Sequence, residues 1–196
     1  MDTLLSFERR ITSANVLFFD MDGTLIDSDY ANFLAYEEAI QQVLGQVLEL
    51  DSFYTSDQRF TRECLERTIP GLTSQHIVKV VQLKNTIYTK YISATKLNKL
   101  AWRILKKYSK TNDTVLVTNC REERAKKMLE YHGVFDNFGH KFFRNDSCGD
   151  KKNKKYRHAL TTLNMDPSLV FAFENDANEI EAAISAGISA HNIYAL

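Results

Sequence analysis

The chain has 196 residues, of which 44% are hydrophobic, and its 25 basic and 25 acidic side chains give a formal net charge of zero. This length suits one domain, or one domain with a modest insert. The balanced charge predicts no nucleic-acid partner and no membrane partner. No apolar run reaches the roughly 18 residues of a transmembrane helix, and the N-terminus lacks the basic and apolar regions of a secretory signal.

The three cysteines, Cys64, Cys120 and Cys148, are odd in number and lack the spacing of a metal site. Reduced thiols of this kind predict a cytoplasmic protein. The sequence leaves the oligomeric state open.

A short apolar run, residues 16–19, follows a predicted helix over residues 3–12 and predicts a strand buried on both faces. The strand ends in two acids one residue apart, Asp20 and Asp22, and Gly23 permits a sharp turn that brings them together. Two carboxylates at the carboxyl end of a buried strand lie where open α/β sheets bind ligands. A solvated Asp-Gly turn is the alternative, but it does not explain why an acid directly follows four apolar residues.

Residues 28–93 carry apolar side chains at helical spacing, with breaks near residues 51–52 and 70–71 and no strand pattern. We therefore expect a helical bundle inserted between the first and second strands. Beyond it, helical and strand patterns alternate, which is typical of a parallel sheet covered by helices. The expected elements are helices over 95–110, 122–131 and 154–163, strands over 113–119, 140–143 and 169–173, a further helix ending at 187, and a last short strand within 188–196.

The motif Asp20-Met21-Asp22-Gly23-Thr24 after an apolar strand resembles the first motif of the haloacid dehalogenase-like hydrolase superfamily. The resemblance implies that Asp20 attacks phosphorus and that Asp22 is the general acid and base. These roles are chemically sound, because a carboxylate can form an aspartyl-phosphate and a second carboxyl group can move the protons. The second acid favours phosphoryl transfer, since true dehalogenases lack it.

The second and third motifs of the superfamily supply groups for the phosphoryl oxygens. A strand that closes on Thr118 resembles the second motif, with Asn119 and Arg121 as candidate substrate contacts beside Gly23 and Thr24. The third motif is a lysine, which would neutralise the charge shared by nucleophile and phosphate. Counting back from the fourth motif places it at Lys151 or Lys152 in a lysine-rich segment, and Lys154 is an alternative.

The stretch over residues 169–187 resembles the fourth motif. It has an apolar strand that ends in Glu174, Asn175 and Asp176, and a helix of small residues follows. The resemblance implies an Mg²⁺ site formed by Asp20, Asp22 and these three residues. Asn175 stands where the superfamily has an aspartate. An amide oxygen is a hard ligand without charge, so Asn175 binds the ion more weakly, or a neighbouring acid supplies the missing charge.

The resemblance implies an α/β fold with a Rossmann-like parallel sheet between helices, strand order 5-4-1-2-3, and an inserted helical cap. Residues 1–27 and 94–196 would form the core and residues 28–93 the cap. The implied function is that of a magnesium-dependent phosphatase that acts on a small phosphorylated metabolite through an aspartyl-phosphate. The alternatives are a phosphotransferase or mutase of the same fold, and a catalytically weak member that binds a phosphorylated ligand. The substrate itself is not encoded in any motif.

Overall fold

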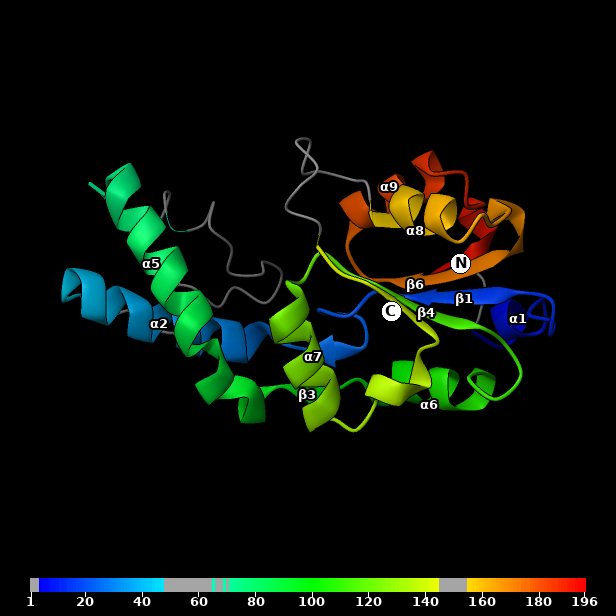
Figure 1. The fold of residues 1–196 in the computed structure, drawn as a ribbon, viewed down its shortest axis with the longest axis horizontal. Helices are drawn as coiled ribbons and strands as arrows, with labels where there is room; N and C mark the ends of the chain where they lie inside the picture. Colours follow the sequence, from blue (N-terminus) through cyan, green and yellow to red (C-terminus); the bar gives the residue numbers. More distant parts are fainter. Residues whose placement is uncertain (1–3, 48–64, 66–68, 70, 145–154) are drawn as a thin grey trace. The chain divides into compact units, whose positions relative to one another are not determined.

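The computed structural model describes residues 4–47, 65, 69, 71–144 and 155–196. Its centre is a parallel five-stranded sheet in the order β5-β4-β1-β6-β7 (Figure 1). The strands are β1 (Val16–Phe19), β4 (Thr114–Val117), β5 (His140–Phe142), β6 (Val170–Glu174) and β7 (Ile193–Ala195). The expected α/β fold and strand order are confirmed.

Alternate residues of each strand point to opposite faces of the sheet, so both faces carry apolar side chains, and helices cover both. On one face Phe18 packs in a core with Tyr156 and Leu160 of α8 (Lys155–Thr162) and Ala183 of α9 (Ala177–Ser185). Figure 1 shows α8 and α9 together on this side of the sheet, with α6 (Lys99–Tyr108) on the other. All four strand residues of β1 are buried, as expected for the middle strand of a sheet covered on both faces.

The opposite face is rich in aromatic rings. Phe7 of α1 (Leu4–Glu8) packs against Phe171, Phe173 and Tyr194 at ring-centroid distances of 5.3, 5.6 and 5.1 Å. Phe173 also stacks on Phe19, with the centroids 4.6 Å apart. These contacts fix β1 and β6 side by side, and the two acidic segments that follow these strands leave the sheet at the same edge.

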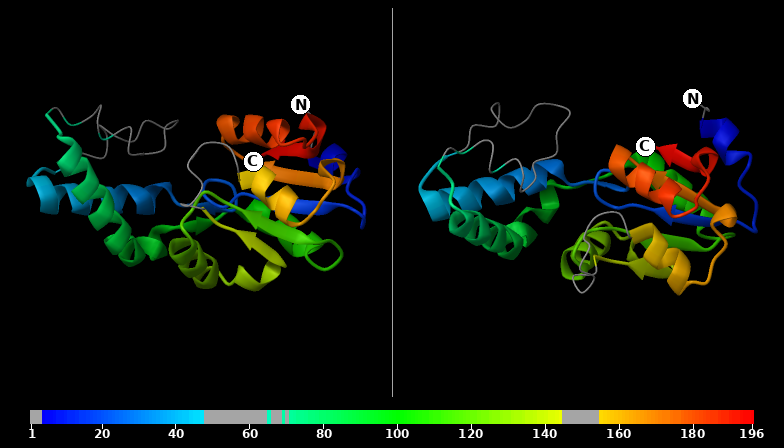
Figure 2. Two further views of the ribbon diagram at one scale, coloured as in Figure 1. Left: turned by 45° about the horizontal axis from the view of Figure 1, so that its top comes forward. Right: turned by 90° about the horizontal axis from the view of Figure 1, so that it is seen from above.

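The chain divides into two compact units, one of residues 1–27 and 97–196 and one of residues 28–96. In the second unit α2 (Asp29–Leu44) packs against α5 (Ser74–Ile87) and the 3-10 helix η1 (Tyr88–Ala94); Figure 2 shows α2 and α5 side by side in two further views. The segments that join the units, β2 (Ile26–Asp27) and β3 (Lys96–Leu97), pair with each other.

The helices predicted over 3–12 and 95–110 are shorter in the structure, and the first of them ends at Glu8. The helix expected from residue 95 begins only at Lys99, because the Asn98 side chain caps it by accepting hydrogen bonds from the N–H groups of Leu100 and Ala101. The helix that starts after the Thr73 cap changes from α to 3-10 at Tyr88. The remaining elements of the core are α7 (Glu122–Tyr131), η2 (Phe135–Asn137), η3 (Pro167–Leu169) and η4 (Ala190–Asn192). Among the described residues, no helix is long and apolar enough to cross a membrane.

Candidate active site

The loop after β1 holds Asp20 and Asp22 in a sharp curl. Gly23 has φ +88°, a conformation that glycine adopts readily, and its N–H donates to the Ile26 carbonyl at 2.8 Å. The Met21 carbonyl accepts from the N–H groups of two residues further along the loop. Both acids are buried, 5% and 7% exposed. Two carboxylates are thus held out of water immediately beyond the middle strand of the sheet.

Lys155, the first residue of α8, places a buried ammonium group between three carboxylates. Its Nζ lies 2.7 Å from Asp20 Oδ1, 2.8 Å from Glu174 Oε2 and 3.4 Å from Glu179 Oε2. Burial lowers the pKa of Lys155, but the neighbouring carboxylates, Asp20 first, outweigh burial and raise the pKa. The ammonium therefore stays charged at neutral pH.

Opposing interactions determine the pKa of Asp20. Its pKa is raised to about 7: burial raises the pKa most, the charge of Lys155 lowers it, and the charges of Glu174 and Asp22 raise it. A carboxylate with little water around it is a stronger nucleophile than a solvated one, and Lys155 keeps its negative charge within reach of neutral pH.

Three polar residues at the end of β6 and directly after it, Glu174, Asn175 and Asp176, make different contacts. Glu174 accepts from Lys155 and from Tyr156 Oη on Oε2, and from the next two backbone N–H groups on Oε1. Asn175 Oδ1 accepts from Thr24 Oγ1 at 2.8 Å. Asp176 caps α9 by accepting from the N–H groups of the first turn. Asn175 is thus the member of this segment that contacts the loop after β1.

Gly23 and Asn175 are packed so closely that only glycine fits the loop. A Cβ added to Gly23 would lie 2.5 Å from Asn175 Nδ2, closer than real Cβ contacts allow. The amide of Asn175 is therefore pressed onto the turn that carries the two acids, and its oxygen is held by Thr24.

The strand β4 brings the second predicted motif to the same edge of the sheet. Thr118 is buried, and its Oγ1 accepts from the Cys120 N–H at 3.0 Å. Asn119 Nδ2 donates to Glu179 Oε1 at 2.8 Å. Arg121 is exposed at the N-cap of α7, whereas Arg124 in the first turn contacts Asp22, with Nη2 2.8 Å from Oδ2.

The charges and donor atoms of this cluster suit a hard divalent cation. Four carboxylates, of Asp20, Asp22, Glu174 and Glu179, face two cations, Lys155 and Arg124. Among the described residues, four acids against two cations leave a surplus of negative charge when all four acids are ionised. Within the same residues the buried Glu179 Oε2 has no hydrogen-bond partner and lies 3.4 Å from Lys155 Nζ.

A metal here would need more than carboxylates as ligands. Within the described ranges, no three His, Cys, Asp or Glu side chains are grouped to hold a metal ion by themselves. Mg²⁺ keeps several waters and binds few protein oxygens, so carboxylate, amide and carbonyl oxygens near Asp20 and Asn175 fit it.

Several predicted site residues meet in the folded chain. The structure gathers Asp20, Asp22, Gly23, Thr24, Glu174 and Asn175 through the contacts above. Thr118 and Asn119 are linked to them through Arg124 and Glu179. Lys151 and Lys152 lie outside the described residues, so their role stays a prediction. The same holds for metal binding by Asp176, whose Oδ1 is engaged at the start of α9.

Three charged residues of the site were not singled out by the sequence: Lys155, Arg124 and Glu179. Lys155 belongs to the lysine-rich segment and lies four residues before the buried Ala159, on the inward face of α8. That spacing is the signal that distinguishes it from its neighbours. Arg124 and Glu179 lie in first turns of helices that follow β4 and β6, where charged side chains are usually solvated, and no sequence pattern marks them.

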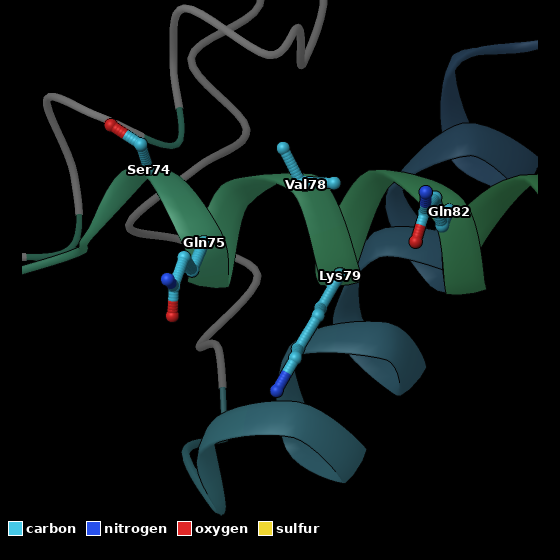
Figure 3. A pocket seen from close by; sticks show the side chains of 5 residues that line it. All are labelled: Ser74, Gln75, Val78, Lys79 and Gln82. Carbon is cyan, nitrogen blue, oxygen red and sulfur yellow. The ribbon is translucent and has the colours of Figure 1, made fainter.

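A hollow of about 400 Å³ lies along α5 in the other unit, lined by Ser74, Gln75, Val78, Lys79 and Gln82 (Figure 3). These side chains include no carboxylate, imidazole or thiol, and they are all on one helix. The hollow therefore lacks the groups of a catalytic site. The candidate active site is the cluster of buried charges around Lys155.

Known proteins resemble this chain in sequence pattern and in fold. Residues 14–187 match the family model described as haloacid dehalogenase-like hydrolase. A haloacid dehalogenase-like family hydrolase from Streptococcus pneumoniae superposes with a TM-score of 0.76 at 19% identity, covering 91% of this chain and 84% of its own. A protein described as a phosphoglycolate phosphatase from Haemophilus somnus gives 0.74 at 18%, covering 94% and 85%. One described as a β-phosphoglucomutase from Thermotoga maritima gives 0.67 at 25%, covering 92% and 84%.

Proposed function

We propose a mechanism for this chain from the premise that it belongs to the haloacid dehalogenase-like hydrolase family. It is an enzyme that acts on phosphoric esters, as a hydrolase or a phosphotransferase. We propose that its reaction is the hydrolysis of a small phosphorylated metabolite through an aspartyl-phosphate. The observation that carries this proposal is the buried Asp20 carboxylate, held by Lys155 at 2.7 Å beside the second acid, Asp22.

In the first step an Asp20 oxygen attacks phosphorus, and the bond from phosphorus to the ester oxygen breaks. Asp22 gives its proton to the leaving alcohol, which takes the bonding electrons. In the second step water attacks the phosphoryl group, Asp22 takes a proton from that water, and the bond between phosphorus and Asp20 breaks. The products are the alcohol and inorganic phosphate, and both carboxyl groups return to their starting states.

Positive charge and hydrogen-bond donors would stabilise the phosphoryl oxygens as their charge develops. Lys155 is our candidate cation, because its ammonium already contacts the nucleophile. The Thr118 hydroxyl and the turn at Gly23 and Thr24 would bind phosphate oxygens. Contacts of Asn119 and Arg121 with the substrate remain part of the proposal.

We propose Mg²⁺ as the cofactor, bound by the Asp20 carboxylate, the Asp22 backbone carbonyl and the segment 174–176. When bound, the ion supplies positive charge that offsets the charges of phosphate and nucleophile. Asn175 contributes an uncharged oxygen, so we expect weaker binding than an aspartate would give. The surplus negative charge of the cluster supports this assignment.

We propose that the unit of residues 28–96, in which residues 48–64, 66–68 and 70 lie outside the described part of the chain, serves as a cap that selects the substrate and excludes water from the reaction. Its described helices α2 and α5 pack on each other and on η1, and the cap role is an expectation from the family. A cytoplasmic location also stays a prediction.

A phosphotransferase or mutase is the second candidate, favoured by the 25% identity to the protein described as a β-phosphoglucomutase. Such an enzyme would pass the phosphoryl group from Asp20 to an alcohol instead of water. Product analysis with an added sugar acceptor separates the two, because a transferase forms a new ester and a phosphatase releases inorganic phosphate.

The test is a panel of phosphorylated metabolites, assayed for phosphate release with and without Mg²⁺. We expect turnover of at least one ester by the natural protein and its loss, by at least about 1,000-fold, in Asp20→Asn, which keeps the shape of the side chain but weakens the nucleophile. Asp136→Asn, an isosteric change at an exposed acid, is the matched control and should keep full activity. Turnover that survives in Asp20→Asn excludes Asp20 as the nucleophile.

A further inference from the structure

Arg124 connects the general acid of the proposed reaction to the strand end that carries Thr118. Its Nη2 donates to Asp22 Oδ2 at 2.8 Å, and its Nε donates to Cys120 Sγ at 2.8 Å. The Asp22 side chain is 8% exposed and that of Arg124 is 22% exposed. One planar guanidinium group therefore joins an acid from the loop after β1 to a residue that follows β4.

Cys120 is a rigid anchor for this contact. Its N–H donates to Thr118 Oγ1 at 3.0 Å, its carbonyl accepts from the Arg144 N–H at 2.9 Å, and its side chain is buried. Because the backbone of Cys120 is held on both sides, the sulfur atom has a defined place. The hydrogen bond from Arg124 Nε to that sulfur therefore fixes the orientation of the guanidinium plane.

We propose that Arg124 is a positioning residue, which holds the Asp22 carboxyl group for proton transfer in the phosphoester reaction. The inference rests on the proposed function, in which Asp22 protonates the leaving alcohol and later deprotonates water. Arg124 itself touches neither phosphorus nor the leaving group; it acts through Asp22. Two donors of one planar group specify an angle as well as a distance, which a point charge such as an ammonium does not.

Substrates with different leaving groups test this role of Arg124. An alkyl alkoxide is a poor leaving group and needs its proton as the ester bond breaks, whereas 4-nitrophenolate leaves without one. Loss of Asp22 positioning should therefore slow transfer from an alkyl ester and spare transfer from the aryl ester. The value of kcat/KM reports the steps up to cleavage of the ester bond, so it isolates this effect from the later hydrolysis of the aspartyl-phosphate.

The experiment compares kcat/KM for glycerol 2-phosphate and 4-nitrophenyl phosphate in the natural protein and in Arg124→Gln. We expect a fall of about 10- to 100-fold for the alkyl ester, part of what general acid catalysis contributes, and less than about 3-fold for the aryl ester. Arg124→Lys should recover only part of the loss. Cys120→Ala removes the sulfur that accepts from Arg124, so kcat/KM for the alkyl ester should fall by less, again with the aryl ester largely spared. Cys120→Ser should keep kcat/KM values close to those of the natural protein.

Lys127→Gln removes a positive charge from the exposed side of the same helix and is the matched control; both esters should react normally. Equal losses for the two esters in Arg124→Gln, or no loss for either, would overturn the positioning role while leaving the proposed function in place. A natural protein that cleaves neither ester nor any member of the metabolite panel overturns the proposed function and this inference together. Near-identical circular dichroism spectra of the variants show that the fold is retained.

Discussion

At the scale of single residues, Lys155 is the cation on which the charge balance of the site depends. Its side chain is 5% exposed, and its ammonium group contacts the carboxylates of Asp20, Glu174 and Glu179. A buried cation that is removed from such a cluster leaves acids that repel one another and lack a solvent shell. The pKa of Asp20, already raised to about 7 by burial, would then lose its one lowering influence among these contacts.

We therefore predict that Lys155→Met lowers phosphatase activity by at least about 100-fold, as loss of an electrostatic donor does. It should also lower the free energy of unfolding by about 3–5 kcal/mol, the usual cost of breaking a buried pair. Activity assays and urea unfolding measure the two effects. Lys127→Met, at an exposed pair, is the control and should change neither. Loss of activity in Lys151→Met or Lys152→Met, with Lys155→Met unaffected, would restore the assignment made from the sequence.

Substitution of Gly23 tests whether activity depends on the close packing of its loop against Asn175. Gly23→Ala would force a Cβ to within 2.5 Å of the Asn175 amide, so we predict a loss of activity of at least about 10-fold together with strain of about 1–2 kcal/mol. Gly133→Ala is matched, because Gly133 also has positive φ, at +65°, but nothing lies within 4 Å of its added Cβ. The control should lose stability and keep its activity, as measured by thermal unfolding and turnover. Equal activity in the two variants would contradict a role for this packing.

Three of the four acids of the site could be predicted from the sequence, whereas Glu179 and the two cations were not singled out. Asp20 and Glu174 directly follow apolar strands, and carboxyl ends of neighbouring parallel strands share one edge of a sheet, so pattern and topology place them together. Lys155 and Arg124 come from the sides of helices. The spacing of Lys155 to the inward face of α8 is a sequence signal for it. For Arg124, by contrast, a first-turn position looks the same whether the side chain is solvated or turned toward an acid, and only the packing of the helix decides.

At the scale of elements, α2 and η1 are joined by the carboxylate of Glu38. It accepts from Lys90 Nζ and from Tyr91 Oη, each at 2.6 Å. The hydrogen bonds from Lys90 and then Tyr91 hold the pKa of Glu38 below its ordinary value of 4.5. The same contact, through the hydrogen bond to Glu38 first, raises the pKa of Tyr91 to about 12. The ionised form of Glu38 is thus the form that stabilises this packing.

A folded-state pKa below the unfolded value gives stability that is present above about pH 4.5 and is lost as the pH falls through the lower, folded value. We predict that Glu38→Gln lowers the free energy of unfolding by about 0.5–1 kcal/mol at pH 7, as expected for a partly exposed pair. The difference from the natural protein should shrink below pH 4.5. Urea unfolding at pH 7 and pH 3 measures it, with Glu123→Gln, at an exposed helix pair, as control. A difference that grows in acid would contradict this role for the Glu38 carboxylate.

Strand positions and strand order were predictable because a buried parallel strand is a short, continuous apolar run. All four residues of β1 and the last three of β4 appear in the sequence as such runs, and chain order with alternating helices leaves few topologies. Helix limits were less predictable. The start of α6 depends on whether Asn98 turns its side chain onto the helix, and the change to 3-10 geometry at Tyr88 has no signal in the apolar spacing.

At the scale of the whole molecule, the chain forms two compact units, each with buried residues of its own. Phe7 lies in the first, 1% exposed against three aromatic rings of β6 and β7. Glu38 lies in the second and ties two of its helices together. Because stability is carried by cooperative units and not evenly by the chain, a change in one unit need not alter local opening in the other.

We predict that Glu38→Gln speeds amide hydrogen exchange in α2 and η1, which its carboxylate joins, and leaves exchange in β1, β4 and β6 unchanged. Phe7→Ala should do the reverse, with a larger effect, since truncation of a buried phenylalanine costs about 3–5 kcal/mol. Exchange measured residue by residue by NMR on the full chain distinguishes the two patterns, and the double variant should show both effects added. Faster exchange throughout the chain in both single variants would mean that the two units unfold as one, and that a substrate-selecting role for residues 28–96 cannot depend on their opening separately.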